Sequence, residues 1–131
     1  MNVITTVITI GAGATIGASV RYYITELMGH LFGKGFPYGT LSANIVGSFV
    51  AGILVVVVLE KAALSDAYRL MLLVGLTGSL TTMSTISWES IEMISSGRYM
   101  HAGLNILLNV LLSLSAAGLG LIVARYLFSA Q

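Results

Sequence analysis

The sequence predicts an all-α membrane protein with four transmembrane helices, the third of them broken at its centre. Of its 131 residues, 56% are hydrophobic and only 8% are charged, whereas soluble domains carry about 25% charged residues. The apolar residues form four segments, each long enough to cross a bilayer, which takes about 20 residues. We therefore expect a single four-helix transmembrane domain over residues 1–131, with spans at about 3–28, 39–59, 69–95 and 102–128.

The overall charge and the rare residue types exclude several classes of protein. A net charge of +1 provides no basic surface for nucleic acid. The chain has no cysteine, so it has no disulfide and no thiolate nucleophile or metal ligand. Its two histidines, His30 and His101, are expected at the edges of loops. The first apolar segment follows Met1 directly and is too long for the core of a signal peptide, so we interpret it as a retained span.

Residues 75–89 read GLTGSLTTMSTISWE, and seven of these fifteen residues carry hydroxyl groups. In hydrocarbon, an unpaired polar group is costly, and irregular backbone is tolerated only where it lines a cavity or is buried in protein. We therefore expect the third span to break near Gly78 to Thr82, exposing backbone and hydroxyls to something other than lipid. Discontinuous helices of this kind mark ion or substrate sites near the membrane midplane.

The first span contains GAGATIGASVRYY at residues 11–23. These glycines lack the G-x-G-x-x-G spacing of a dinucleotide-binding loop, and their flanks are typical of a membrane helix. Gly13 and Gly17 form a small-xxx-small pair that lets two helices approach closely, although glycine is also simply common in membrane helices. Arg21 either extends to the headgroups beside Tyr22 and Tyr23 or stands at the mouth of an aqueous vestibule, where it would attract anions.

The second span opens with GTLSANIVGSFVAG. Ala43, Gly47 and Ala51 recur every four residues and predict a smooth stripe for helix packing. Asn44 is the strongly polar side chain well inside this span. Its amide either joins two helices by a hydrogen bond or donates to an anion, and the sequence leaves both roles open.

The third span carries its apolar and polar side chains on neighbouring faces. Met83 and Ile86 are three residues apart and share one helix face, where packing in the core is the alternative to any functional role. Glu89 and Glu92 are expected where the span leaves the membrane. The neighbouring face carries Thr82, Thr85 and Glu89.

The fourth span carries a polar stripe. Asn105, Asn109 and Ser113 stand at i, i+4 and i+8, on one face of a helix. A polar stripe in a membrane helix should face protein or water and not lipid. We expect this face to point into the bundle.

The basic residues give no bias in orientation. Four spans place both termini on one side, with three cations on that side and three on the other, so the positive-inside rule has nothing to act on. Such a chain can insert both ways, and two copies could pair antiparallel about a two-fold axis. Alternatively, another feature sets the orientation or the balance is chance. The three cations on the side of the termini are Lys61, Arg69 and Arg125, and the three on the other side are Arg21, Lys34 and Arg98.

The motifs GAGATIGASVRY, GTLSANIVGSFVAG and GLTGSLTTMSTISWE resemble those of the CrcB/Fluc family of bacterial fluoride channels. The resemblance covers all four spans in order, and the third motif is the most specific. It implies an antiparallel, dual-topology homodimer in the bacterial inner membrane, with two anion pores. Fluoride would leave the cytoplasm passively through them, which protects the cell against fluoride toxicity.

The resemblance also implies roles for particular residues. A structural Na⁺ on the two-fold axis would be bound by the backbone carbonyls of Gly78 and Thr81 from each subunit. Arg21 would stand in the vestibule. The residues expected to line the fluoride pore are Asn44, Thr82, Met83, Ser84, Thr85, Ile86 and Ser113.

One departure from the family pattern concerns the third motif, which usually reads TTFSTF. The two phenylalanine positions are Met83 and Ile86 here. A phenyl ring edge carries partial positive charge, whereas isoleucine offers only an apolar wall. Hydroxyl and amide donors would still suit a small hydrated anion, because carbonyls and carboxylates select cations instead.

Three other functions compete with an anion channel. A small dual-topology exporter of multidrug or guanidinium-like cations needs a membrane-embedded carboxylate, but Glu26 and Glu60 sit at the ends of the first two spans. A structural subunit of a membrane complex would leave the hydroxyl-rich break unexplained. An enzyme is not expected, because the chain offers no nucleophile–base pair or metal-ligand cluster.

Overall fold

The computed structural model describes residues 1–60 and 64–128, and its regular structure in these ranges is entirely helical. Four segments in this part of the chain are long and apolar enough to cross a membrane, as the composition predicts. They are Val3–Phe32, Tyr38–Glu60, Asp66–Ser95 and Tyr99–Phe128. Lys61, which the charge comparison uses, lies outside the described residues.

The spans are built from six α-helices and two π-helical segments. The first and last spans are single helices, whereas the middle two combine several elements. In chain order the elements are α1 (Val3–Phe32), α2 (Tyr38–Val55), η1 (Val56–Glu60), α3 (Asp66–Arg69), η2 (Leu70–Thr77), α4 (Gly78–Leu80), α5 (Met83–Ser95) and α6 (Tyr99–Phe128).

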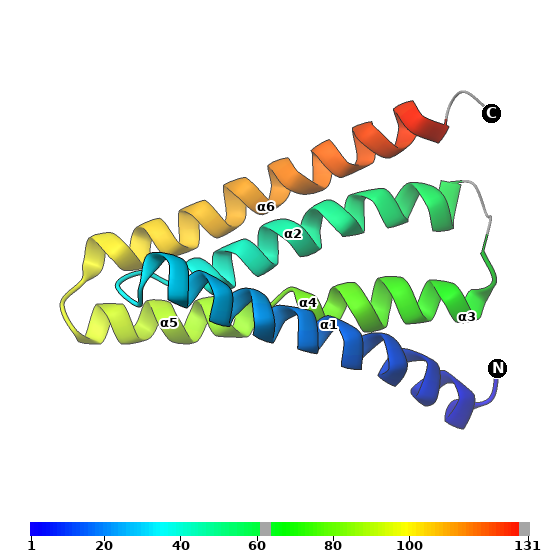
Figure 1. Cartoon of the computed structure of the whole chain (residues 1–131), viewed down its shortest axis with the longest axis horizontal. Coiled ribbons are helices and arrows are strands. Elements are labelled where there is room, and N and C mark those ends of the chain that lie inside the picture. Colours follow the sequence, from blue (N-terminus) through cyan, green and yellow to red (C-terminus); the bar gives the residue numbers. More distant parts are fainter. Residues whose placement is uncertain (61–63, 129–131) are drawn as a thin grey trace.

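The helices form an elongated bundle, with the start of α1 and the end of α6 at the same end (Figure 1). The short connections 33–37 and 96–98 lie at the opposite end. Helix α2 packs mainly along α6, and α1 packs mainly across η2 and α4. The third span therefore contacts the first span before the middle of the bundle and the fourth span, through α5, after it.

Helix α1 continues past the expected end near Met28, and the residues from Gly29 to Phe32 are helical instead of forming a loop. The helix stops at Gly33, whose φ of 76° lies in the left-handed region that glycine tolerates best. The Gly33 N–H donates to the Gly29 carbonyl at 3.0 Å. The helix therefore ends at Gly33, where φ is positive, and not at Gly29, the first glycine of the stretch.

Glycines bring the helices into close backbone contact at several crossings, of which two set the spacing of the spans. A Cβ on Gly13 or Gly17 would overlap the carbonyl oxygens of Met71 or Leu76, so the predicted role of this pair in close packing is confirmed. At the second crossing, a Cβ on Gly120 of α6 would overlap the Phe49 carbonyl of α2. These contacts fix how far the third span stands from the first, and the fourth from the second.

Candidate functional site

The polar residues of the third span gather where α4 ends at Leu80 and α5 begins at Met83. Between these helices the backbone of Thr81 (φ −86°, ψ 155°) and Thr82 (φ −154°, ψ 119°) is extended. The Thr82 hydroxyl accepts the Thr85 N–H at 3.3 Å and so caps the new helix. A serine or threonine in this position is a typical start signal for a helix.

The carbonyls of Gly78 and Thr81 are among those that the extended residues leave without their helical donors. In a continuous helix the Thr82 N–H would bond to the Gly78 carbonyl, but it donates to Asn44 Oδ1 at 2.7 Å instead. The Thr85 N–H, which would serve the Thr81 carbonyl, bonds to Thr82 Oγ1. The Thr81 carbonyl accepts one long contact, 3.5 Å, from Arg21 Nη1.

Asn44 binds the extended backbone through both ends of its side-chain amide. Its Oδ1 accepts the Thr82 N–H, while its Nδ2 donates to the Thr82 carbonyl at 3.2 Å and to Asn109 Oδ1 at 2.9 Å. Of the two roles that the sequence leaves open for Asn44, this geometry favours joining two helices. Both amide hydrogens already have acceptors within the chain.

A cavity of about 480 Å³ lies beside the extended residues, between α2, α5 and α6. Met83 is 64% exposed on its wall, whereas Ile86 is only 6% exposed. The two residues at the family's phenylalanine positions therefore differ strongly in how far they reach into open space. This cavity brings together seven predicted site residues, namely Asn44, Gly78, Thr81, Thr82, Met83, Ile86 and Ser113.

A second cavity, of about 310 Å³, lies on the other side of the extended residues, against α1. Arg21 lines it, and its Nη1 donates to the Thr81 carbonyl at 3.5 Å, a geometry that favours the vestibule interpretation. Tyr22 and Tyr23, its neighbours, are mostly exposed. Polar groups from three helices and the extended connection meet in this cavity: Arg21, Thr25, Thr40, Thr82, Thr85 and Glu89.

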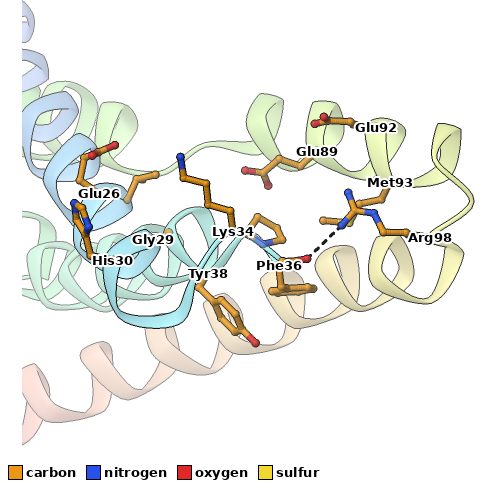
Figure 2. A pocket seen from close by; sticks show the side chains of 15 residues that line it. Glu26, Gly29, His30, Lys34, Phe36, Tyr38, Glu89, Glu92, Met93 and Arg98 are labelled. Carbon is orange, nitrogen blue, oxygen red and sulfur yellow. Dashed lines mark hydrogen bonds between the residues drawn. The ribbon is translucent and has the colours of Figure 1, made fainter.

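A third cavity, of about 490 Å³, opens at the end of the bundle that holds the 33–37 connection. Figure 2 shows charged groups around it, with Glu26 and His30 on the α1 side and Glu89 and Glu92 across from them. Arg98 donates to the Gly35 carbonyl at 3.2 Å and so holds the connection in place.

The three cavities share wall residues. Thr25 and Glu89 line both the cavity at the bundle end and the one beside α1. Thr82 lines both the cavity beside α1 and the one between α2, α5 and α6. The cavities therefore follow one another from the bundle end to both sides of the extended residues, with polar groups at each junction.

Glu89 has more partners than its sequence position indicates. The residue is partly buried, and its carboxylate accepts hydrogen bonds from Thr40 Oγ1 and Asn105 Nδ2. Glu92, three residues later, is exposed. The expected position of both residues at the membrane boundary stays a prediction. Ser84 also differs from the other predicted pore residues, since it is exposed and lines none of these three cavities.

Ser113 offers a free hydroxyl beside Asn109. Within the described ranges its oxygen is the buried side-chain polar atom that lacks a hydrogen-bond partner, and the residue lines the cavity that Met83 also lines. Other serines in these helices bond back to a carbonyl one turn earlier, as Ser115 does to Leu111 at 2.8 Å. An unpaired hydroxyl is costly when buried, so this one is available to a ligand.

We expect Ser113→Ala to keep the fold and to lower ion transport, because it removes a donor that the chain does not use. The expected reduction is about tenfold, corresponding to one hydrogen bond to a charged group of roughly 1.5 kcal/mol. Initial transport rates from proteoliposomes measure it. Ser115→Ala is the matched control on the same helix, and an equal rate for both variants would contradict the role of Ser113.

The four spans define a multi-pass membrane protein with polar cavities where α4 ends and α5 begins, and its relatives place it in the bacterial plasma membrane. The chain belongs to the CrcB family, because residues 8–121 match the family described as CrcB-like protein, Camphor Resistance (CrcB).

Curated relatives carry a more specific description. A protein from Vibrio campbellii, named fluoride-specific ion channel FluC, is 44% identical over 111 residues, covering 85% of this chain and 87% of the relative. A Roseiflexus protein of the same name is 40% identical over 121 residues, covering 92% and 98%. A third relative of that name, from Sulfurihydrogenibium, is 42% identical over 118 residues, covering 90% and 95%.

Proposed function

We propose that this protein is a fluoride channel that lets fluoride leave the cytoplasm passively and so protects the cell against its toxicity. The observation that carries the proposal is the succession of three cavities that share the wall residues Glu89 and Thr82. The names of the relatives indicate which ion would use such a route. No enzymatic activity is part of the proposal.

The polar groups along this route suit a small hydrated anion. Fluoride must exchange its water for hydrogen-bond donors, and hydroxyl groups can supply them. Thr82 and Thr85 line the cavity beside α1, and Ser113 lines the cavity near Met83. Arg21 adds a positive charge to the wall of the cavity beside α1. Asn44 would position the backbone, and Ile86 would provide an apolar wall.

The interruption between α4 and α5 is, in this proposal, a true break of a membrane span that serves ions. A structural Na⁺ would be held by the carbonyls of Gly78 and Thr81. Both carbonyls fit this role, because their helical donors bond elsewhere and both residues line one cavity. The cation would supply positive charge close to the anion route.

A second copy of the chain would complete the site. The cavity lined by Asn44, Thr82 and Met83 opens to the outside of the single chain, and polar backbone cannot face lipid. An antiparallel partner would cover it and bring a second pair of Gly78 and Thr81 carbonyls to the Na⁺. Labelling of terminal tags in intact cells tests this arrangement, since termini on only one side of the membrane would contradict dual topology.

A small exporter of guanidinium-like cations is the alternative function. Glu89 is the partly buried carboxylate that such an exporter would use, but it shares a cavity with Arg21 and is hydrogen-bonded to Thr40. A cation bound there would meet the guanidinium as well as the carboxylate. The names of the relatives do not favour this alternative.

Efflux from liposomes tests the proposed function. Purified protein should release fluoride from loaded vesicles on addition of a K⁺ ionophore, with chloride release at least about 100-fold slower, which corresponds to 2.7 kcal/mol of selectivity. Protein-free vesicles provide the background. A preparation that is folded and dimeric but releases fluoride no faster than this background would overturn the assignment, and release of guanidinium instead would support the exporter.

A further inference from the structure

Three buried asparagines form a chain of side-chain amides between Thr82 and Glu89. Asn44 Nδ2 donates to Asn109 Oδ1 at 2.9 Å, and Asn109 Nδ2 donates to the Asn105 carbonyl and Oδ1 at 2.8 and 2.9 Å. Asn105 Nδ2 in turn donates to Ser90 Oγ at 3.2 Å and Glu89 Oε2 at 3.4 Å. Both hydrogens of each side-chain amide are donated in hydrogen bonds. The second hydrogen of Asn44 is donated to the Thr82 carbonyl.

The groups at the two ends fix the direction of this chain. At one end, the Thr82 N–H can only donate, so Asn44 must present its oxygen there. At the other end, an ionised Glu89 can only accept, so Asn105 must present its nitrogen. The carbonyl of Asn105 also only accepts and sets the orientation of Asn109. Every amide therefore has one orientation in which all its hydrogen bonds are satisfied.

Asn105, at the Glu89 end of the chain, lies away from the cavities, whereas Asn109 lines the cavity between α2, α5 and α6. Asn105 is 0% exposed and lines none of the three cavities described above. An ion using those cavities would not touch it. Asn105 nevertheless joins α6 to α5 at Ser90 and Glu89. Any effect of Asn105 on transport must therefore act through its neighbours.

We propose that Asn105 is a positioning residue, which ties Glu89 and Ser90 of α5 to Asn109 and so holds Asn44 and the extended backbone at Thr82 in place. This inference deepens the proposed function and rests on it. With its own hydrogens held by the chain, Asn44 keeps the Thr82 backbone in place, and the hydroxyl groups of the cavities remain the donors that face the ion.

Exchanging the donor and the acceptor at the end of the chain tests this inference. Asn105→Asp is nearly isosteric but turns a carboxylate toward Glu89, so the chain loses its terminal hydrogen bond and gains a repulsion. Fluoride efflux should fall at least about tenfold, as expected for one lost buried hydrogen bond. Glu89→Gln alone preserves an acceptor for Asn105. In the double variant, the new glutamine donates to the new aspartate, so a hydrogen bond between the two positions is regained. Its efflux should return to within about threefold of that of Glu89→Gln.

The unfolding midpoints of the same four proteins in detergent provide a readout that needs no transport. They should fall for Asn105→Asp and recover in the double variant. Parent protein without fluoride efflux would refute the proposed function, while the midpoints would still test the amide chain. If Asn105 only fills space, Asn105→Asp transports normally or the double variant is no better than Asn105→Asp, and either result overturns the inference.

Discussion

Replacing Asn44 by aspartate should abolish fluoride transport. The amide nitrogen of Asn44 faces two acceptors, the Thr82 carbonyl and Asn109 Oδ1, and an aspartate oxygen in its place would be repelled by both. Leaving a buried charge without a partner costs about 3–5 kcal/mol. We expect efflux to fall at least about 100-fold, the equivalent of 2.7 kcal/mol, to the background of protein-free vesicles.

Asn2→Asp is the matched control for this substitution. The Asn2 side chain caps α1 by accepting from the Thr5 N–H at 2.9 Å and from the Thr5 hydroxyl, and aspartate accepts equally well in that position. This control should transport at the parent rate. If Asn44→Asp transports as fast as the control, the Asn44 amide does not hold the extended backbone in the conducting protein.

Gly13→Ala should prevent stable packing of the first span on the third. A Cβ at this position would overlap the Met71 carbonyl and approach the Leu76 nitrogen to 2.9 Å. Both neighbours are backbone atoms, which cannot move aside alone, so the helices must separate. Overpacking typically costs 1–3 kcal/mol, and we expect the free energy of unfolding to fall by about 3 kcal/mol.

Gly11→Ala, two residues earlier on α1, provides the comparison. A Cβ there would meet nothing within 4 Å, and alanine favours a helix over glycine by about 1 kcal/mol. The two substitutions should therefore change the free energy of unfolding in opposite directions. Denaturant titration in detergent measures both, and similar effects at the two positions would show that α1 does not pack through Gly13.

Much of this architecture follows from the sequence because it depends on local patterns. Apolar length predicts four spans, and the spacing of Gly13 and Gly17 predicts a close helix crossing. The stripe of Asn105, Asn109 and Ser113 predicts a face turned into the bundle, and this is confirmed because Asn105 and Asn109 are 0% and 2% exposed. Each of these signals comes from residues that are close together in the sequence, and each has a single physical cause.

Pairing between distant residues could not be predicted in the same way. Asn44 and Thr82 are 38 residues apart, and the sequence does not show that the Asn44 amide is fully used by Thr82 and Asn109. The sequence predicts Glu89 at the membrane boundary, because a charge near a span's end usually reaches solvent, but it does not show which side chains bind the carboxylate. Its actual partners, Thr40 and Asn105, come from two other spans.

The reversal potential of currents through the purified protein in a planar bilayer tests the central claim most directly. For passive, selective fluoride conduction, it should follow the fluoride gradient by about 59 mV per tenfold change in concentration, the value for a single charge. It should not move when the chloride or proton gradient is changed at constant fluoride. A reversal potential that follows the chloride or proton gradient would contradict the account.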